Sequence, residues 1–277
     1  MITTLVYGFT IGGILYILSI GLSLTFGSMR IVNFAHALVY TTGAYFLVVA
    51  LRTLGLSFLP AAAVATVAVL PIAAGIERFV IRRLYGESLD YAIIATYAVL
   101  LIGVDLIKWV FGATPIPLSD PIGRDVGLFG ISFPLYRLLI IVLAISIHGG
   151  LYLFFKRTIV GKIVVAGLED KDAVRSLGID VDRYFAIVFL VGIGLAALGG
   201  VLYAPITSVH PYMGFQVLLI SFAVVIVGGM GSLHGTFLAS FGLGMVIAIT
   251  GRYWGPAAET MVYAVMAVVL IFKPLDV

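Results

Sequence analysis

The chain has 277 residues, of which 62% are hydrophobic and only 10% are charged, and it contains no cysteine. Soluble domains usually carry about 25% charged residues, so this composition excludes an ordinary soluble protein and favours one that lies in a membrane. The lack of cysteine excludes disulfides and thiolate chemistry, and a net charge of +3 does not favour a nucleic-acid-binding protein.

Long unbroken apolar runs indicate helices, because backbone groups in hydrocarbon must bond within their own helix or in a closed barrel. Barrel strands would instead alternate in polarity over about ten residues. We therefore predict an all-α, polytopic transmembrane bundle that forms a single domain over residues 1–277. A span needs about 20 residues, and about nine runs (eight to ten) qualify. They cover residues 4–27, 35–51, 58–80, 91–112, 136–155, 184–206, 213–230, 234–250 and 255–272. The runs at 35–51, 213–230 and 234–250 are short, which is compatible with tilted, broken or re-entrant segments.

Small residues recur at helical spacing in the first and sixth spans. Gly8 and Gly12 share one stripe, and Gly192, Ala196 and Gly200 share another. Such stripes let helix backbones approach closely in lipid, so we predict helix–helix contacts along both.

The start of the second span carries an unusual polar pair. Asn33 is the only asparagine in the chain, and His36 follows three residues later, so on a helix the two would share a face. Such a pair either lines a transport path or forms structural hydrogen bonds across helices, and both interpretations stay open. Asp105 and Lys108, near the outer end of the fourth span, have the same spacing and are interpreted as a structural ion pair.

The loop at 156–183 is the most charged stretch of the chain. We predict a short amphipathic helix near 169–177, with acids at its start, where they complement the helix dipole, and a glycine capping its end. Its apolar stripe needs a packing partner, and the equal number of acids and bases suits an anionic lipid surface poorly, which favours docking to a protein. The residues concerned are Asp170, Asp172, Ala173, Val174, Arg175, Leu177 and Gly178.

Basic residues predict the orientation in the membrane. Loops on the side of residues 156–183 hold most of the sixteen lysines and arginines, including Arg30 and Lys273, whereas the opposite side holds Arg52, Arg124, Arg137 and Arg252. Because basic loops stay in the cytoplasm, we expect the N-terminus outside and the C-terminus in the cytoplasm.

Several motifs, taken in order, resemble the permeases of branched-chain amino acid ABC transporters, most closely the first of their two permease subunit types. The matching segments are residues 27–36, 83–84, 94–96, 109–112, 161–163, 173–180, 192–202, 228–235 and 273–274. The resemblance implies that the segment at 169–177 is a coupling helix that docks on a separate ATPase.

The resemblance also implies a set of partners. They are a second homologous permease, two ATP-binding cassette ATPases, an extracytoplasmic solute-binding protein and membrane lipid. No Walker-type phosphate-binding sequence occurs here, so we expect no cofactor in this chain, ATP and Mg²⁺ on the partner ATPases, and no enzymatic or nucleic-acid-binding role.

Two glycine-interrupted segments, residues 27–43 and 228–244, lie on the predicted inner side, and broken segments of this kind often line transport paths. The candidate pathway residues are Asn33, His36, Thr96, Gly229 and Gly231. We expect no catalytic residues, and no metal site, since His148, His210 and His234 are dispersed in the sequence.

The expected solute is a branched-chain or related small amino acid. Ala37, Leu38 and Ala98 depart from the residues usual in the family, so urea, short amides and small carboxylates stay open as alternatives. A stand-alone channel or ion-coupled carrier is the alternative of a different class.

Overall fold

The computed structural model describes residues 2–29, 31–84, 86–128 and 131–272. Arg30 and the C-terminal residues, on which part of the predicted orientation and the resemblance at 273–274 rest, lie outside these ranges. The elements in chain order are α1 (Ile2–Met29), α2 (Ala35–Arg52), α3 (Phe58–Phe79), η1 (Ile81–Leu84), α4 (Leu89–Phe111), β1 (Asp125–Leu128), β2 (Ile131–Pro134), α5 (Leu135–Arg157), α6 (Ile159–Glu169), α7 (Lys171–Ser176), α8 (Val181–Tyr203), α9 (Met213–Gly228), α10 (Leu233–Tyr253), η2 (Gly255–Ala257) and α11 (Ala258–Phe272).

The predicted helical bundle is confirmed. Within the described ranges, eight helical segments are long and apolar enough to cross a membrane by length and composition, and α9 is a shorter apolar helix. Each of the nine predicted runs therefore corresponds to a helix. α2 and α10 are continuous through the runs at 35–51 and 234–250, so neither run is broken.

α1 lies at the centre of the bundle, where it packs against α5, α8, α9 and α10. Its apolar residues surround the whole helix, the pattern expected when every side is buried, and Tyr16, Ile17 and Leu18 are fully buried. α3, α4 and α5 bury one side only and expose leucine, isoleucine and valine on the other. In a membrane these exposed faces are available to lipid.

The small-residue stripes form close helix contacts, as predicted. A Cβ placed on Gly12 would lie 2.8 Å from the Cα of Phe241 on α10, and one on Gly192 would lie 2.8 Å from the carbonyl oxygen of Gly21 on α1. Gly200 faces the carbonyl of Tyr40 on α2 just as closely. Glycine is therefore required for α1 to pack between α8 and α10.

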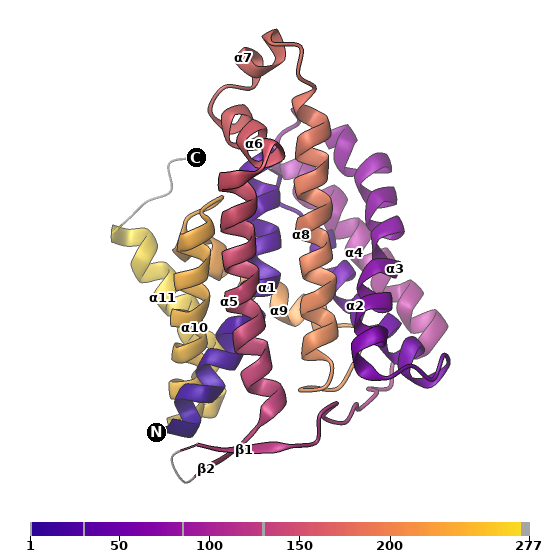
Figure 1. Ribbon diagram of the computed structural model, residues 1–277, viewed down its shortest axis with the longest axis vertical. Helices are drawn as coiled ribbons and strands as arrows, with labels where there is room; N and C mark the ends of the chain where they lie inside the picture. Colours follow the sequence, from indigo (N-terminus) through magenta and orange to yellow (C-terminus); the bar gives the residue numbers. More distant parts are fainter. Residues whose placement is uncertain (1, 30, 85, 129–130, 273–277) are drawn as a thin grey trace.

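The two ends of the bundle differ (Figure 1). α6 and α7 extend beyond one end, and the β1–β2 hairpin and the N-terminus lie at the other. The hairpin was not predicted, because its strands of four residues lie among the prolines and glycines of the loop at 113–135. A bridge between Ile116 and Val209 ties the same loop to the α8–α9 connection.

α6 was also missed, since residues 159–169 were assigned to a charged loop. The hydroxyl of Thr158 accepts a hydrogen bond from the backbone N–H of Gly161 at 3.0 Å, which is an N-cap that the sequence displays. α6 buries Gly161, Val164 and Gly167 at helical spacing.

Candidate functional site

Thr96 organises the turn between α1 and α2. Its hydroxyl oxygen accepts a hydrogen bond from the backbone N–H of Phe34 at 3.1 Å and lies 3.3 Å from the carbonyl of Val32. It also donates to the carbonyl of Ala92 on its own helix, α4, at 2.7 Å. One buried threonine thus fixes the non-helical turn at 31–34 against α4, beside Asn33 and His36.

Asn33 and His36 are both buried, at 1% and 0% exposure, but they are bonded differently. The Nε2 atom of His36 lies 3.1 Å from the carbonyl of Leu18 on α1. In the described part of the chain, neither polar atom of the Asn33 side chain has a hydrogen-bond partner. An unpaired buried amide costs free energy. In the described residues the His36 Nε2 atom is thus bonded to α1, whereas the Asn33 amide and the His36 Nδ1 atom have no partner.

Phe34 connects this turn to α9. Its ring lies 5.9 Å from that of Tyr97 on α4, in an edge-to-face arrangement, and 5.2 Å from that of Phe222 on α9. The turn between α1 and α2 is therefore packed between α4 and α9.

Gly229 and Gly231 lie in the short connection between α9 and α10. Their φ angles are +88° and +80°, values that only glycine adopts without strain. The N–H of Gly231 donates to the hydroxyl of Ser23 on α1 at 3.1 Å, and a Cβ on Gly27 would lie 2.8 Å from the Cα of Gly231. The two glycine-interrupted segments of the sequence thus meet backbone to backbone beside α1.

α7 is capped at both ends: the sequence predicts the C-terminal glycine cap, whereas the N-cap at Asp170 was not predicted. The carboxylate of Asp170 accepts hydrogen bonds from the N–H groups of Asp172, at 3.1 Å, and Ala173, at 2.9 Å. Gly178 follows the helix with a φ of +78°, the left-handed conformation of a C-terminal cap.

The predicted apolar stripe of α7 divides into two faces. Val174 is only 7% exposed and packs with Val164 of α6 and Val181 and Phe185 of α8. Leu177 is 76% exposed, and Ala173 is exposed as well. The surface of α7 that is open to a partner is therefore Leu177 and Ala173, without Val174.

Asp182, at the start of α8, was not among the predicted site residues. Its carboxylate forms ion pairs with Lys171, at 2.7 Å, and with Arg175, and the bond to Asp182 raises the pKa of Arg175. Arg175 also lies 3.7 Å from Asp172. A signal was present in the sequence, since two bases precede the turn at Gly178 and two acids, Asp180 and Asp182, follow it. These ion pairs hold α7 against the end of α8.

Two further predictions, one on a charged pair and one on the histidines, can be compared with the structure. The predicted pair of Asp105 and Lys108 is confirmed, and Lys108 also donates to the hydroxyl of Tyr212 at 3.1 Å. Two of the histidines that are far apart in the sequence lie close together in space: the Nε2 atom of His148 lies 3.1 Å from the Nδ1 atom of His234. α5 and α10 bring these two together, although the described residues contain no cluster of three metal-ligating side chains.

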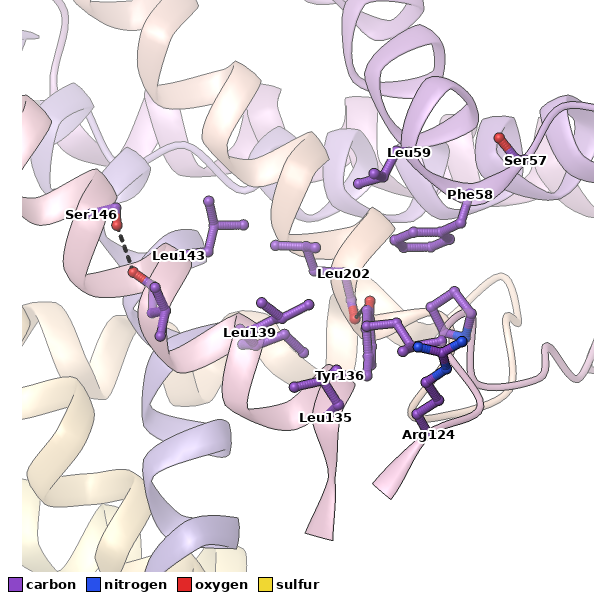
Figure 2. A pocket seen from close by; sticks show the side chains of 14 residues that line it. Ser57, Phe58, Leu59, Arg124, Leu135, Tyr136, Leu139, Leu143, Ser146 and Leu202 are labelled. Carbon is purple, nitrogen blue, oxygen red and sulfur yellow. Dashed lines mark hydrogen bonds between the residues drawn. The ribbon is translucent and has the colours of Figure 1, made fainter. Parts of the chain in front are cut away.

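A groove of about 710 Å³ lies near the hairpin end, between α3, α5 and the end of α8. Figure 2 shows Phe58 and Leu59 of α3 on one side and Leu139 and Leu143 of α5 on the other, with Arg124 at the edge. Arg124 is the only charged residue of the lining. This chemistry suits an apolar ligand and offers little to a polar solute.

A bundle of helices long and apolar enough to cross a membrane, packed around a buried central helix and with a capped helical extension at one end, is the architecture of a multi-pass membrane protein. The chain belongs to the family described as the permease component of the branched-chain amino acid transport system, whose profile matches residues 4–273. It is accordingly a transport subunit.

Curated relatives match over nearly the whole chain. The high-affinity branched-chain amino acid transport system permease protein BraD of Pseudomonas aeruginosa is 29% identical, over 98% of this chain and 93% of that protein. The corresponding permease protein LivH of Escherichia coli is 26% identical, over 96% and 92%. A probable LivH of Methanocaldococcus jannaschii is 26% identical, over 89% and 80%.

A solved structure shares the fold. PsaBC from Streptococcus pneumoniae, determined in complex with Fab, superposes with a TM-score of 0.52 at 17% identity, over 99% of this chain and 90% of that one. The likeness extends to the whole chain.

Proposed function

We propose that this chain is the membrane-spanning permease subunit of an ATP-binding cassette importer that moves branched-chain amino acids, or closely related small amino acids, into the cytoplasm. The family and the names of the curated relatives support the solute class. The chain supplies the path and is not an enzyme, and ATP with Mg²⁺ is bound and hydrolysed by two partner ATPases. A second permease and an extracytoplasmic solute-binding protein complete the complex.

The observation that carries the proposal is the capped helix α7. It lies outside the bundle, is held to α8 by ion pairs to Asp182, and presents Leu177 almost fully exposed. A stand-alone channel has no need of an anchored helix with an exposed leucine at its end. A groove on a partner would bury that leucine, and burial of a leucine side chain is worth about 1.5–3 kcal/mol.

The end that carries α6 and α7 faces the cytoplasm in this proposal, and the hairpin end faces outward, in a bacterial inner membrane. The excess of basic residues on the α6–α7 side supports this orientation. Asn33, His36 and Thr96, with Gly229 and Gly231, then surround α1 near the cytoplasmic side, where movement of the coupling helix would reach the path.

The substitution Leu177→Asp tests the proposal. A carboxylate at this position would be buried unpaired in a partner's groove, at a cost of several kcal/mol, so the ATPases should no longer co-purify with the permease. Solute-stimulated ATP hydrolysis should be lost in parallel, while the permease still inserts and folds, because Leu177 is exposed in the isolated chain.

Leu54→Asp is the matched control, since Leu54 is also exposed, at 58%, but it follows the end of α2 beside Arg52, which donates to the carbonyl of Pro117 in the loop that leads to the hairpin. It should leave ATPase association intact. Normal association and stimulated hydrolysis in Leu177→Asp would exclude α7 as the coupling element and favour the channel or carrier.

A further inference from the structure

A second cavity, of about 140 Å³, lies near the hairpin end and is enclosed by α1, the α8–α9 connection, α9, α10 and the start of α11. This volume equals roughly five water molecules, taking about 30 Å³ for each. It is therefore of the size of a small solute.

Several polar residues line this cavity. Glu259 is exposed and forms no ion pair within the described residues. His210 is hydrogen-bonded to Gln216, the only glutamine in the chain. Burial lowers the pKa of His210, although the bond to Gln216 opposes this, so the ring is neutral at pH 7. Tyr203 and Thr207, each of which carries a hydroxyl, also line the cavity.

Aliphatic side chains make up much of the rest of the lining. Ile14, Leu15 and Ile220 are buried, and Ile247 is partly exposed. The cavity therefore joins an acid and several hydrogen-bonding groups to a wall suited to a short hydrocarbon chain. The larger groove in Figure 2 lacks this combination, because its one charged residue is Arg124 and the rest of its lining is mostly apolar.

We propose that this cavity is the outward-facing site at which the permease receives a small aliphatic α-amino acid. The ammonium group binds the Glu259 carboxylate, the solute carboxylate accepts hydrogen bonds from Gln216 and the neighbouring hydroxyls, and the side chain lies against the aliphatic wall. The assignment rests on the proposed function and extends it to named residues of recognition.

The experiment uses the complete importer in vesicles, with its binding protein loaded with leucine, and measures both leucine uptake and ATP hydrolysis. In Glu259→Gln, leucine taken up per ATP hydrolysed should fall by about tenfold or more, the effect of losing a charged hydrogen bond. Stimulation of ATP hydrolysis by the loaded binding protein should be unchanged. Glu87→Gln, at an exposed acid in the η1–α4 connection, is the matched control and should transport as the wild type does.

The substitution Ile247→Phe tests the aliphatic wall independently. It should lower the ratio of leucine to valine uptake by about tenfold, because one methylene in an apolar pocket is worth about that factor. This variant carries the test alone if Glu259→Gln does not assemble.

The outcomes separate the two proposals. A wild-type complex without ATP-dependent leucine uptake would overturn the proposed function and the site together. A wild-type complex that transports, combined with unchanged uptake per ATP in Glu259→Gln or an unchanged ratio in Ile247→Phe, would overturn the site alone. Equal losses of uptake and hydrolysis in Glu259→Gln would assign Glu259 a structural role, and this result would also overturn the proposed site.

Discussion

Two polar residues three positions apart have different surroundings in this bundle. The His36 ring is bonded to the backbone of α1, whereas the Asn33 amide is buried without a partner in the described part of the chain. Buried polar groups are normally paired, and exceptions call for an explanation. A role in the path, with the amide meeting the solute or a rearranged backbone during transport, supplies one.

The isosteric change Asn33→Leu separates the two roles. Removing an unpaired buried amide should preserve or raise stability, by up to about 1–3 kcal/mol, while uptake per assembled complex falls. Thermal unfolding and vesicle uptake measure the two effects. Thr96→Val is the comparison: it removes the acceptor of the Phe34 N–H and should cost about 1 kcal/mol. A stability loss in Asn33→Leu as large as that in Thr96→Val, with normal uptake, would make the amide a structural group.

At the scale of elements, the central position of α1 depends on close backbone contact. Gly8, Gly12 and Gly21 of α1 have no room for a side chain against α10 and α8. In lipid, where apolar burial does not drive helices together, such contacts and the dispersion energy they bring hold the bundle.

The substitution Gly12→Val should therefore disrupt the contact between α1 and α10. Overpacking costs about 1–3 kcal/mol in well-packed cores, so the thermal midpoint of the purified permease should fall clearly. Gly149→Val is the control, because Gly149 is also helical but nothing lies within 4 Å of a Cβ placed there. Equal destabilisation by both would show that helix propensity, and not packing, is responsible.

At the scale of the whole molecule, the end of the bundle at which each proposed site lies determines how the two sites work together. The cavity is lined in part by the α8–α9 connection and the start of α11. These segments lie at the hairpin end, whereas α7 lies at the other end (Figure 1). A solute received at one end and a partner ATPase docked at the other is the arrangement that an importer needs. The excess of basic residues is the evidence for which end is cytoplasmic.

Cysteine labelling tests this orientation on a chain that has no native cysteine. A membrane-impermeant thiol reagent applied from outside should modify Gly127→Cys and leave Ser176→Cys unmodified. Gly127 is preferable to Gly123, whose φ of +58° would strain any other residue, and a Cβ at Gly127 meets nothing within 4 Å. The reverse labelling pattern would invert the topology and exclude α7 as a cytoplasmic docking element.

The sequence by itself determined the environment of the protein, its long apolar helices and their approximate ends, the small-residue stripes, the glycine cap of α7 and the pair of Asp105 and Lys108. These features depend on the transfer of residues to lipid and on interactions within a few positions along the chain, and both are visible in a local window. The N-cap at Thr158 was visible in the sequence too. α6 was nevertheless missed, because the charged residues of this stretch favoured a loop.

Only the tertiary structure decided which side of a helix meets which neighbour. It placed α1 at the centre, turned Val174 inward and Leu177 outward, tied Lys171 and Arg175 to Asp182, and left the Asn33 amide unpaired. It also brought Ile14, His210, Gln216 and Glu259 around one cavity, although they span most of the chain. Helical periodicity fixes the direction in which each side chain leaves its helix. Which neighbouring helix lies in that direction is set by the packing of all the helices together.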